Sequence, residues 1–184
     1  MKRGIRCMVV SAAFSLALAV TAQTVRADES HKQTDDTLAQ ETQTRGYWFD
    51  PTTGLMWAAK DNGKDVNWHD ADKYCRKLRV AGYSDWRLAS LTELKAIFDR
   101  NAAANGLYGA GSKKQVYVWH VRGDLFLTGL QEWSSTQRVD DHGVAHGLVW
   151  YFDFSRGIQF AEDGTRFSGR FANYGLRALC VRQL

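Results

Sequence analysis

The stretch Asn67–Leu94, NWHDADKYCRKLRVAGYSDWRLASLTEL, decides the fold because it predicts two helices joined by a short connector. In its first half, apolar residues recur at steps of three and four, the spacing of one helix face: Trp68, Ala71, Cys75 and Leu78. Asn67 is placed to cap this helix, and Gly82 is placed to end it. Cys75 is therefore expected to point toward the core, where a distant strand can reach it.

The second helix is predicted from Ser90-Leu91-Thr92-Glu93, which has the pattern of a capping box. Its apolar face is expected at Leu91, Leu94, Ile97 and Phe98. The pattern fades at Asn101, and the Ala-, Gly- and Ser-rich residues from there to Lys114 are expected to form a loop.

Outside these helices the apolar residues recur with period two, which indicates strands. Asp50-Pro51-Thr52-Thr53-Gly54 lies between two apolar runs and predicts a β-hairpin. Later strands are expected at Val116–Val121, Leu125–Leu127, Trp133–Thr136, Leu148–Phe154, Ile158–Phe160 and Leu176–Val181. We expect Leu148–Phe154 to be central in its sheet. This order predicts an α+β domain in which two helices pack on a looped antiparallel sheet.

Residues 1–27 have the features of a secretory signal peptide. Three Lys and Arg residues within the first six positions precede the apolar run Met8–Val20, which is too short for a comfortable membrane span. Small residues suit cleavage after Ala27 or after Ala22. We therefore expect export to the periplasm, the cell surface or the medium, with no membrane span after cleavage.

The basic character of the sequence belongs largely to this leader. The full chain has 24 basic and 20 acidic residues, and cleavage after Ala27 removes four basic residues and leaves 20 of each sign. A neutral mature chain is not expected to bind nucleic acid. Residues 28–45 contain two basic and five acidic residues, whereas residues 46–184 contain 18 and 15, an excess of three positive charges.

Composition divides the mature chain into a tether and one domain. Residues 28–45 contain one Leu and no aromatic residue, so we expect a disordered polar tether. Residues 46–184 contain all seven Trp, all seven Tyr and eight of the nine Phe. Such aromatic density predicts a single domain with a well-filled core.

Cys75 and Cys180 are the two cysteines outside the leader. An even pair in an exported protein is most simply one disulfide, here between the first helix and the last strand. Two free buried thiols are the alternative. Metal binding by two isolated cysteines is not expected, because no further ligands stand at the usual spacing.

Six motifs in residues 46–184 occur in the order of one known family: Thr53–Trp57, Trp68 with Tyr74-Cys75, Gly82–Leu88, Glu93-Leu94, Trp133–Ser135 and Cys180–Arg182. Together they resemble the C-terminal domain family of the Legionella collagen-like protein. The resemblance implies a C-type-lectin-like fold with a disulfide from the first helix to the final strand. It also implies an exported bacterial attachment domain, because the founding member is similar to an adhesin that binds sulfated glycosaminoglycans.

The chain departs from the family pattern in three ways. Ala89 stands where the family has Pro, and no collagen repeat precedes the domain, so the oligomeric state stays open. The Glu-Pro-Asn and Gln-Pro-Asp triplets of calcium-dependent lectins are absent. We therefore expect neither calcium-dependent sugar binding nor a cofactor.

The most polar cluster in the sequence precedes the expected central strand and contains Asp140, Asp141, His142 and His146. Two carboxylates and two imidazoles could ligate a divalent metal. Gly143 and Gly147 favour a solvated loop instead, which would still border the usual ligand face of a lectin-like fold.

Basic and aromatic residues in the loop-rich half form the second candidate set: Lys113, Lys114, Trp119, His120, Arg122, Arg138, Trp150 and Arg156. Basic groups suit sulfate or carboxylate, and aromatic faces suit sugar rings. The alternative is ordinary solvated charge beside core aromatics. Arg122-Gly123-Asp124 also spells a cell-adhesion tripeptide, a match that is common by chance.

These features predict a non-enzymatic, exported lectin-like binding domain that recognises an anionic or sulfated glycan, or a protein surface, in attachment or envelope interaction. The sequence has no nucleophile elbow, P-loop or dinucleotide fingerprint. One alternative is a metal-dependent module or enzyme centred on residues 140–146. Another is a periplasmic domain that binds an envelope protein and no glycan.

Overall fold

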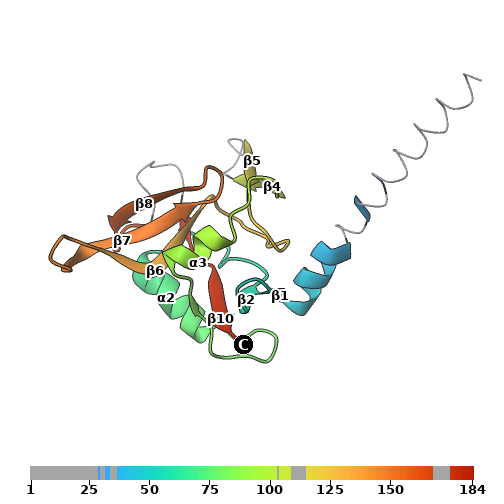
Figure 1. Cartoon of the computed structure of the whole chain (residues 1–184), viewed down its shortest axis with the longest axis horizontal. Helices are drawn as coiled ribbons and strands as arrows, with labels where there is room; N and C mark the ends of the chain where they lie inside the picture. The colour runs from blue at the N-terminus through green and yellow to red at the C-terminus, as the bar shows by residue number, and fades with distance from the viewer. Residues whose placement is uncertain (1–28, 30–31, 34–36, 103, 109–114, 168–174) are drawn as a thin grey trace, which may run out of the picture. The chain divides into compact units, whose positions relative to one another are not determined.

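The computed structural model describes residues 29, 32–33, 37–102, 104–108, 115–167 and 175–184 (Figure 1). The expected signal peptide, Lys113 and Lys114 lie outside these residues. Ala39–Leu184 form one compact unit. Within the described ranges, no helix combines the length and the apolar character needed to cross a membrane.

The first sheet joins the two ends of the domain. Its strand order is β1-β2-β10-β3, and all neighbours are antiparallel. The strands are β1 (Tyr47–Asp50), β2 (Leu55–Ala58), β10 (Cys180–Gln183) and β3 (Arg87–Leu88). Asp50 shapes the β1–β2 turn, because its carboxylate accepts from Thr52 N and Thr53 Oγ1. The predicted opening hairpin is confirmed.

The second sheet has the order β8-β7-β6-β9. Its strands are β8 (Ile158–Asp163), β7 (Ala145–Asp153), β6 (Gln131–Val139) and β9 (Leu176–Arg177). The predicted central position of Leu148–Phe154 is confirmed, because β7 pairs with both β6 and β8. A separate two-stranded ribbon consists of β4 (Ala104–Tyr108) and β5 (Gln115–Trp119).

The two helices begin as predicted. Helix α2 (Trp68–Lys77) is capped by Asn67, whose side-chain oxygen accepts from Asp70 N at 2.8 Å. Helix α3 (Leu91–Ala96) opens with both halves of the Ser90–Glu93 capping box. Glu93 also pairs with Arg87 at 2.6 Å, which ties the start of α3 to β3.

Two apolar clusters fill the space on the two faces of the first sheet. Strand β2 contributes to both because its side chains alternate: Leu55 and Trp57 enter one cluster, and Met56 and Ala58 enter the other. The first cluster includes the buried face of α3, and the second includes Ala71 and Cys75 of α2. Strand β7 also contributes to both clusters, so each cluster is lined by strands of both sheets.

A disulfide joins Cys75 of α2 to Cys180 of β10, with a Cα–Cα distance of 5.4 Å. Both residues are fully buried. The α+β class and this disulfide are confirmed, and the free-thiol alternative is wrong.

Four details of the expected elements are wrong. The expected loop from Asn101 to Lys114 contains strand β4, Ala104–Tyr108, which pairs with β5. Helix α2 ends at Lys77, and Gly82 lies in a later turn where Ala81 and Gly82 both have positive φ. Leu125–Leu127 form no strand; Phe126 makes only an isolated bridge to Lys60. Leu176–Val181 divide into β9 and β10, because the chain crosses from the second sheet to the first at Ala178-Leu179.

The expected tether also differs from the structure at its C-terminal end. Residues 37–45 are helical. Thr42 is buried, and the Gln43 amide donates to Ala59 O and Asp124 O, each at 3.1 Å. Two side-chain hydrogen bonds to main-chain carbonyls thus hold the end of this segment on the domain, a local interaction that composition alone does not reveal.

Candidate ligand-binding sites

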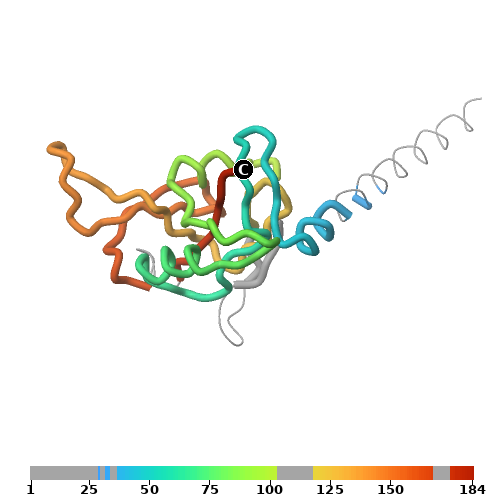
Figure 2. Tube along the Cα trace, turned by 90° about the horizontal axis from the view of Figure 1, so that it is seen from below, coloured from blue at the N-terminus to red at the C-terminus, as the bar shows by residue number. Residues whose placement is uncertain are grey.

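The β6–β7 hairpin carries the polar cluster that the sequence analysis singled out. It extends past the last β7–β8 pair, Leu148 with Asp163, and projects from the rest of the sheet (Figures 1 and 2). Asp140 organises its turn: Oδ1 accepts from His142 N and Val144 N, each at 2.9 Å. Its other oxygen, Oδ2, lies 2.8 Å from His146 Nε2.

In this arrangement the carboxylate of Asp140 has little capacity left to bind a metal ion. The hydrogen bond from His146, followed by those from the backbone, lowers the pKa of the Asp140 carboxyl. Both oxygens are already engaged within the hairpin, and the side chains of residues 140–146 are exposed. Across the described residues, no group of three or more His, Cys, Asp or Glu side chains is placed to hold a metal ion.

A shallow hollow of about 350 Å³ lies beside the hairpin and includes Arg138, Asp140, Asp141, His146 and Leu148 in its lining. The Arg138 guanidinium stands 5.8 Å from the centre of the Trp150 ring. Arg138, Trp150 and three of the four polar residues from the expected metal cluster are thus neighbours. The hollow has mixed charge, which favours neither an anion nor a cation.

The other sequence candidates do not join this group. Trp119 is 2 % exposed and its indole N–H donates to Gly129 O, so it belongs to the core and its assignment to a ligand surface is wrong. His120 packs edge-on against Phe98. Arg156 pairs with Asp153 at 3.3 Å.

The Arg122-Gly123-Asp124 tripeptide is part of the packing. A Cβ on Gly123 would lie 2.0 Å from the Trp48 ring. Arg122 donates to Thr52 Oγ1 at 3.3 Å and lies 3.9 Å from the Asp50 carboxylate. The tripeptide is therefore held against the β1–β2 hairpin and does not project as a recognition loop.

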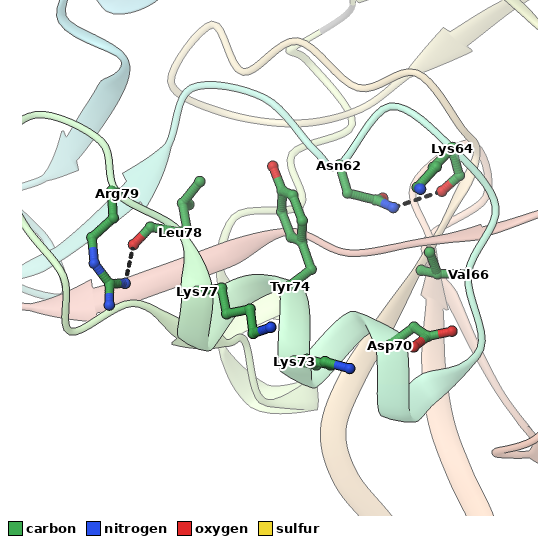
Figure 3. Close-up of a pocket in the computed structure, with 9 residues that line it drawn as sticks. All are labelled: Asn62, Lys64, Val66, Asp70, Lys73, Tyr74, Lys77, Leu78 and Arg79. Atoms are coloured by element: carbon green, nitrogen blue, oxygen red, sulfur yellow. Dashed lines mark hydrogen bonds between the residues drawn. The ribbon is translucent and has the colours of Figure 1, made fainter.

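A cleft of about 470 Å³ lies between α2 and the chain that precedes it (Figure 3). We call it the α2 cleft. Its lining residues are Asn62, Lys64, Val66, Asp70, Lys73, Tyr74, Lys77, Leu78 and Arg79. None of them belongs to the candidate sets from the sequence.

Helical spacing builds one wall of the α2 cleft. Asp70, Lys73, Tyr74 and Lys77 stand at positions i, i+3, i+4 and i+7 and so share one face of α2. Figure 3 shows the Tyr74 ring rising from the helix between Leu78 and Asn62. Arg79 closes one end, where its Nη1 donates to the carbonyls of Arg76, Leu78 and Ser84.

Hydrogen bonds to the β9–β10 crossover hold the opposite wall. Asn62 makes two hydrogen bonds with Ala178. The Asn62 backbone N–H donates to Ala178 O at 3.1 Å, and Asn62 Oδ1 accepts from the Ala178 N–H at 2.8 Å. Val66 N donates to Leu176 O at 2.9 Å. The Trp133 indole donates to Val66 O at 2.9 Å. The disulfide fixes α2 to the first residue of β10, so both walls depend on the same C-terminal segment.

Positive charge dominates the α2 cleft. Its lining contains four cationic side chains, those of Lys64, Lys73, Lys77 and Arg79, and one carboxylate. That carboxylate, Asp70, already accepts from the Asn67 amide at 3.0 Å. Burial and then the nearby charge of Asp61 raise the pKa of the Tyr74 hydroxyl, so it is a neutral hydrogen-bond donor at physiological pH.

A buried acidic group lies behind the second wall. Glu132 is fully buried, and no N–H or O–H group in the described part of the chain donates to either of its oxygens. Burial, and then the charge of Asp61, raises the pKa of the Glu132 carboxyl well above its usual value, although Arg177 opposes the shift. Protonated Glu132 can donate to the Asp61 carboxylate, which precedes Asn62 of the cleft.

The α2 cleft was not predicted from the sequence, because the candidate residues were taken from the loop-rich second half of the chain, whereas the cleft residues lie between positions 62 and 79. The available signal was the helical spacing of Lys73, Tyr74 and Lys77. The contribution of Lys64 and Asn62 from the opposite wall has no comparable signal in the sequence.

Comparison with known protein families finds a match for the domain. Residues 46–174 match the family model described as the Lcl C-terminal domain. No curated protein matches the sequence.

Proposed function

Because the chain belongs to the Lcl C-terminal domain family, we propose that it is an exported, non-catalytic binding domain with a lectin-like fold that holds an anionic glycan in the α2 cleft. The observation that carries the proposal is the excess of cationic side chains in this cleft. Four cations face one carboxylate that a neighbouring amide already engages. Sulfate and carboxylate groups are the complementary ligands.

The apolar part of the lining supports a sugar in preference to a free inorganic anion. Tyr74, Leu78 and Val66 present carbon surface between the charged groups. A pyranose ring has carbon faces and a rim of hydroxyl groups. Such a lining can bury a carbon face and form hydrogen bonds with the hydroxyl groups. The Tyr74 hydroxyl and the Asn62 amide add directional polar contacts.

Export is part of the proposal. The leader pattern of residues 1–27 supports it, and so does the Cys75–Cys180 disulfide, because such bonds persist in oxidising compartments. Attachment to a glycan or to another envelope surface is the role that such a domain would serve outside the cytoplasm.

Charge reversal in the cleft tests the proposal. We expect the double variant Lys73→Glu/Lys77→Glu to weaken binding to heparin-derived oligosaccharides at least about tenfold in isothermal titration calorimetry, because it removes two charge-assisted contacts. The wild-type affinity should also fall with added salt. Lys95→Glu/Arg100→Glu makes the same change of charge at exposed positions outside the cleft lining and should bind nearly as the wild type does.

Three results count against the proposal. Equal affinity of the wild type and the Lys73→Glu/Lys77→Glu variant would remove the α2 cleft as the site. If Arg138→Glu abolished binding instead, the ligand would belong on the β6–β7 hairpin. A wild type that binds no anionic oligosaccharide but captures an envelope protein would favour the protein-binding alternative.

A further inference from the structure

The turn that follows α2 holds an exposed tyrosine in a fixed place. Val80 and Tyr83 form an antiparallel bridge, and Tyr83 N donates to Val80 O at 3.0 Å. Ala81 has a φ of 54° and Gly82 a φ of 79°. In the described part of the chain, Ala81 and Asp124 are the two non-glycine residues with positive φ. A side chain in this conformation costs free energy, so the surrounding structure must impose the turn.

An arginine supports the ring of Tyr83 from one side. The Arg182 guanidinium lies 3.9 Å from the ring centre. Asp85 fixes this guanidinium, because its carboxylate accepts hydrogen bonds from Arg182 Nε at 2.8 Å and from Arg182 Nη2 at 3.0 Å. The Arg182 side chain is 10 % exposed, whereas Tyr83 is 36 % exposed. Because Arg182 covers one face, the exposed part of Tyr83 lies on the other face and the ring edge.

This turn adjoins one end of the α2 cleft. Figure 3 shows Arg79 and Lys64 at opposite ends of the lining. At the Arg79 end, the guanidinium donates to Ser84 O at 3.4 Å, and Ser84 follows Tyr83 in the chain. One arginine thus contributes its charge to the cleft and also contacts the turn that presents the aromatic ring.

We propose that Tyr83 is a sugar-stacking subsite that continues the α2 cleft past Arg79. An oligosaccharide that places its anionic groups in the cleft packs the carbon face of its next ring on the exposed face of Tyr83. Stacking of this kind needs a flat aromatic surface that is already ordered, because less conformational entropy is then lost on binding. The Asp85–Arg182–Tyr83 stack and the fixed turn supply this order.

The subsite rests on the proposed function of the cleft, and ligand length separates the two. A heparin-derived disaccharide should occupy the cleft alone, whereas an octasaccharide of the same repeat should also reach Tyr83. By calorimetry, we expect Tyr83→Ala to bind the disaccharide as the wild type does and the octasaccharide about three- to tenfold more weakly. Tyr83→Phe should keep the octasaccharide affinity because the ring remains. Phe126→Ala, at an exposed aromatic outside the cleft lining, is the matched control.

A measurement on the wild type covers the case in which Tyr83→Ala does not fold. The NMR signals of the Tyr83 ring should shift with the octasaccharide and stay in place with the disaccharide. If both ligands bind but the Tyr83 signals do not respond, or Tyr83→Ala keeps the full octasaccharide affinity, the subsite is wrong and the cleft stands. If neither ligand binds the wild type, the proposed function fails and the subsite with it.

Discussion

The β6–β7 hairpin and the α2 cleft differ in how they use polar residues. The hairpin concentrates carboxylates and imidazoles within seven consecutive residues. Both carboxylate oxygens of Asp140 are engaged in hydrogen bonds within the hairpin itself. The cleft gathers its cations from residues 64 to 79, and no carboxylate is paired with Lys64, Lys73 or Lys77 among the contacts of the described residues. Residues that are close along the chain therefore form a local turn, whereas residues that converge in space form the cationic cleft.

The two regions also differ in what fixes them. The hairpin needs only its own backbone bonds and the Asp140 side chain. The cleft needs α2, the disulfide, the residues between Asp61 and Val66, and the β9–β10 crossover at the same time. Changes to the core should therefore disturb the cleft and leave the hairpin turn intact, and changes in the hairpin should do little to the cleft.

The largest effect is expected when the disulfide is removed. The Cys75→Ala/Cys180→Ala variant should lose about 4 kcal/mol of unfolding free energy, because the bond closes a loop between residues 105 positions apart. Urea unfolding measures this loss. Oligosaccharide binding should fall with it, because α2 is no longer tied to β10. A variant that binds oligosaccharide as well as the wild type does would contradict the dependence of the cleft on this bond.

The next effect concerns Glu132 and the pH. Its pKa is raised in the folded state by burial and by Asp61, so the folded protein binds this proton more tightly than the unfolded chain does. The stabilisation is complete below the unfolded pKa, about 4.3, and is lost as the pH rises through the folded pKa. Urea unfolding from pH 5 to 9 should show this decline.

The variant Glu132→Gln distinguishes the contribution of Glu132 to this pH dependence from the contributions of other titrating groups. The variant should flatten the decline and be more stable than the wild type at the alkaline end by about 1–3 kcal/mol, because an unpaired buried carboxylate is avoided. Asp141→Asn, at an exposed position of the hairpin, is the control and should follow the wild type. The charged groups that face Glu132 are Asp61 and Arg177, and Arg177 pairs with Asp65 at 3.2 Å. An unchanged slope in Glu132→Gln would assign the decline to another group.

A smaller effect is expected at the start of α2. Asn67→Ala removes the N-cap and should cost about 1 kcal/mol of unfolding free energy. It should also weaken oligosaccharide binding, because Asp70 and Lys73 lie in the turns that the cap holds. Ser90→Ala removes the cap of α3 at a similar cost in stability but should leave binding unchanged. Equal loss of binding in both variants would mean that stability alone, and not the α2 wall, controls affinity.

Much of the fold follows from local rules that the sequence displays. The Asn67 cap, the Ser90–Glu93 capping box and the Asp50–Gly54 turn each depend on residues within five positions of one another. The Cys75–Cys180 pair was predictable for a different reason, because the two cysteines outside the expected leader leave one simple pairing. These features were confirmed.

Features that depend on long-range contacts were not predictable in the same way. The period-two pattern of Leu176–Val181 is continuous, yet the chain leaves one sheet for the other after Arg177. Nothing local distinguishes Trp119, which is buried, from Trp150, which is only partly buried. The α2 cleft was missed because its walls meet only once Asn62 and Val66 bond to Ala178 and Leu176.

The smallest effect is expected at Asp140. Asp140→Ala should remove the hydrogen bonds to the amides of His142 and Val144 and the contact with His146. Hydrogen exchange at these two amides should therefore accelerate. The unfolding free energy should stay near that of the wild type. In the wild type the pKa of Asp140 is lowered, so its bonds are complete above the usual Asp value of about 3.9 and are lost as the pH falls through its folded pKa. Acid should therefore loosen the hairpin in the wild type and change little in Asp140→Ala.

Asp141→Ala is the control for this change, because the contacts recorded for the hairpin involve Asp140 and not Asp141. Oligosaccharide affinity should be equal in both variants and in the wild type. A loss of affinity in Asp140→Ala alone would show that the hairpin turn shapes the ligand site. The two regions would then be one binding surface, and the contrast between a self-contained turn and a convergent cleft would be wrong.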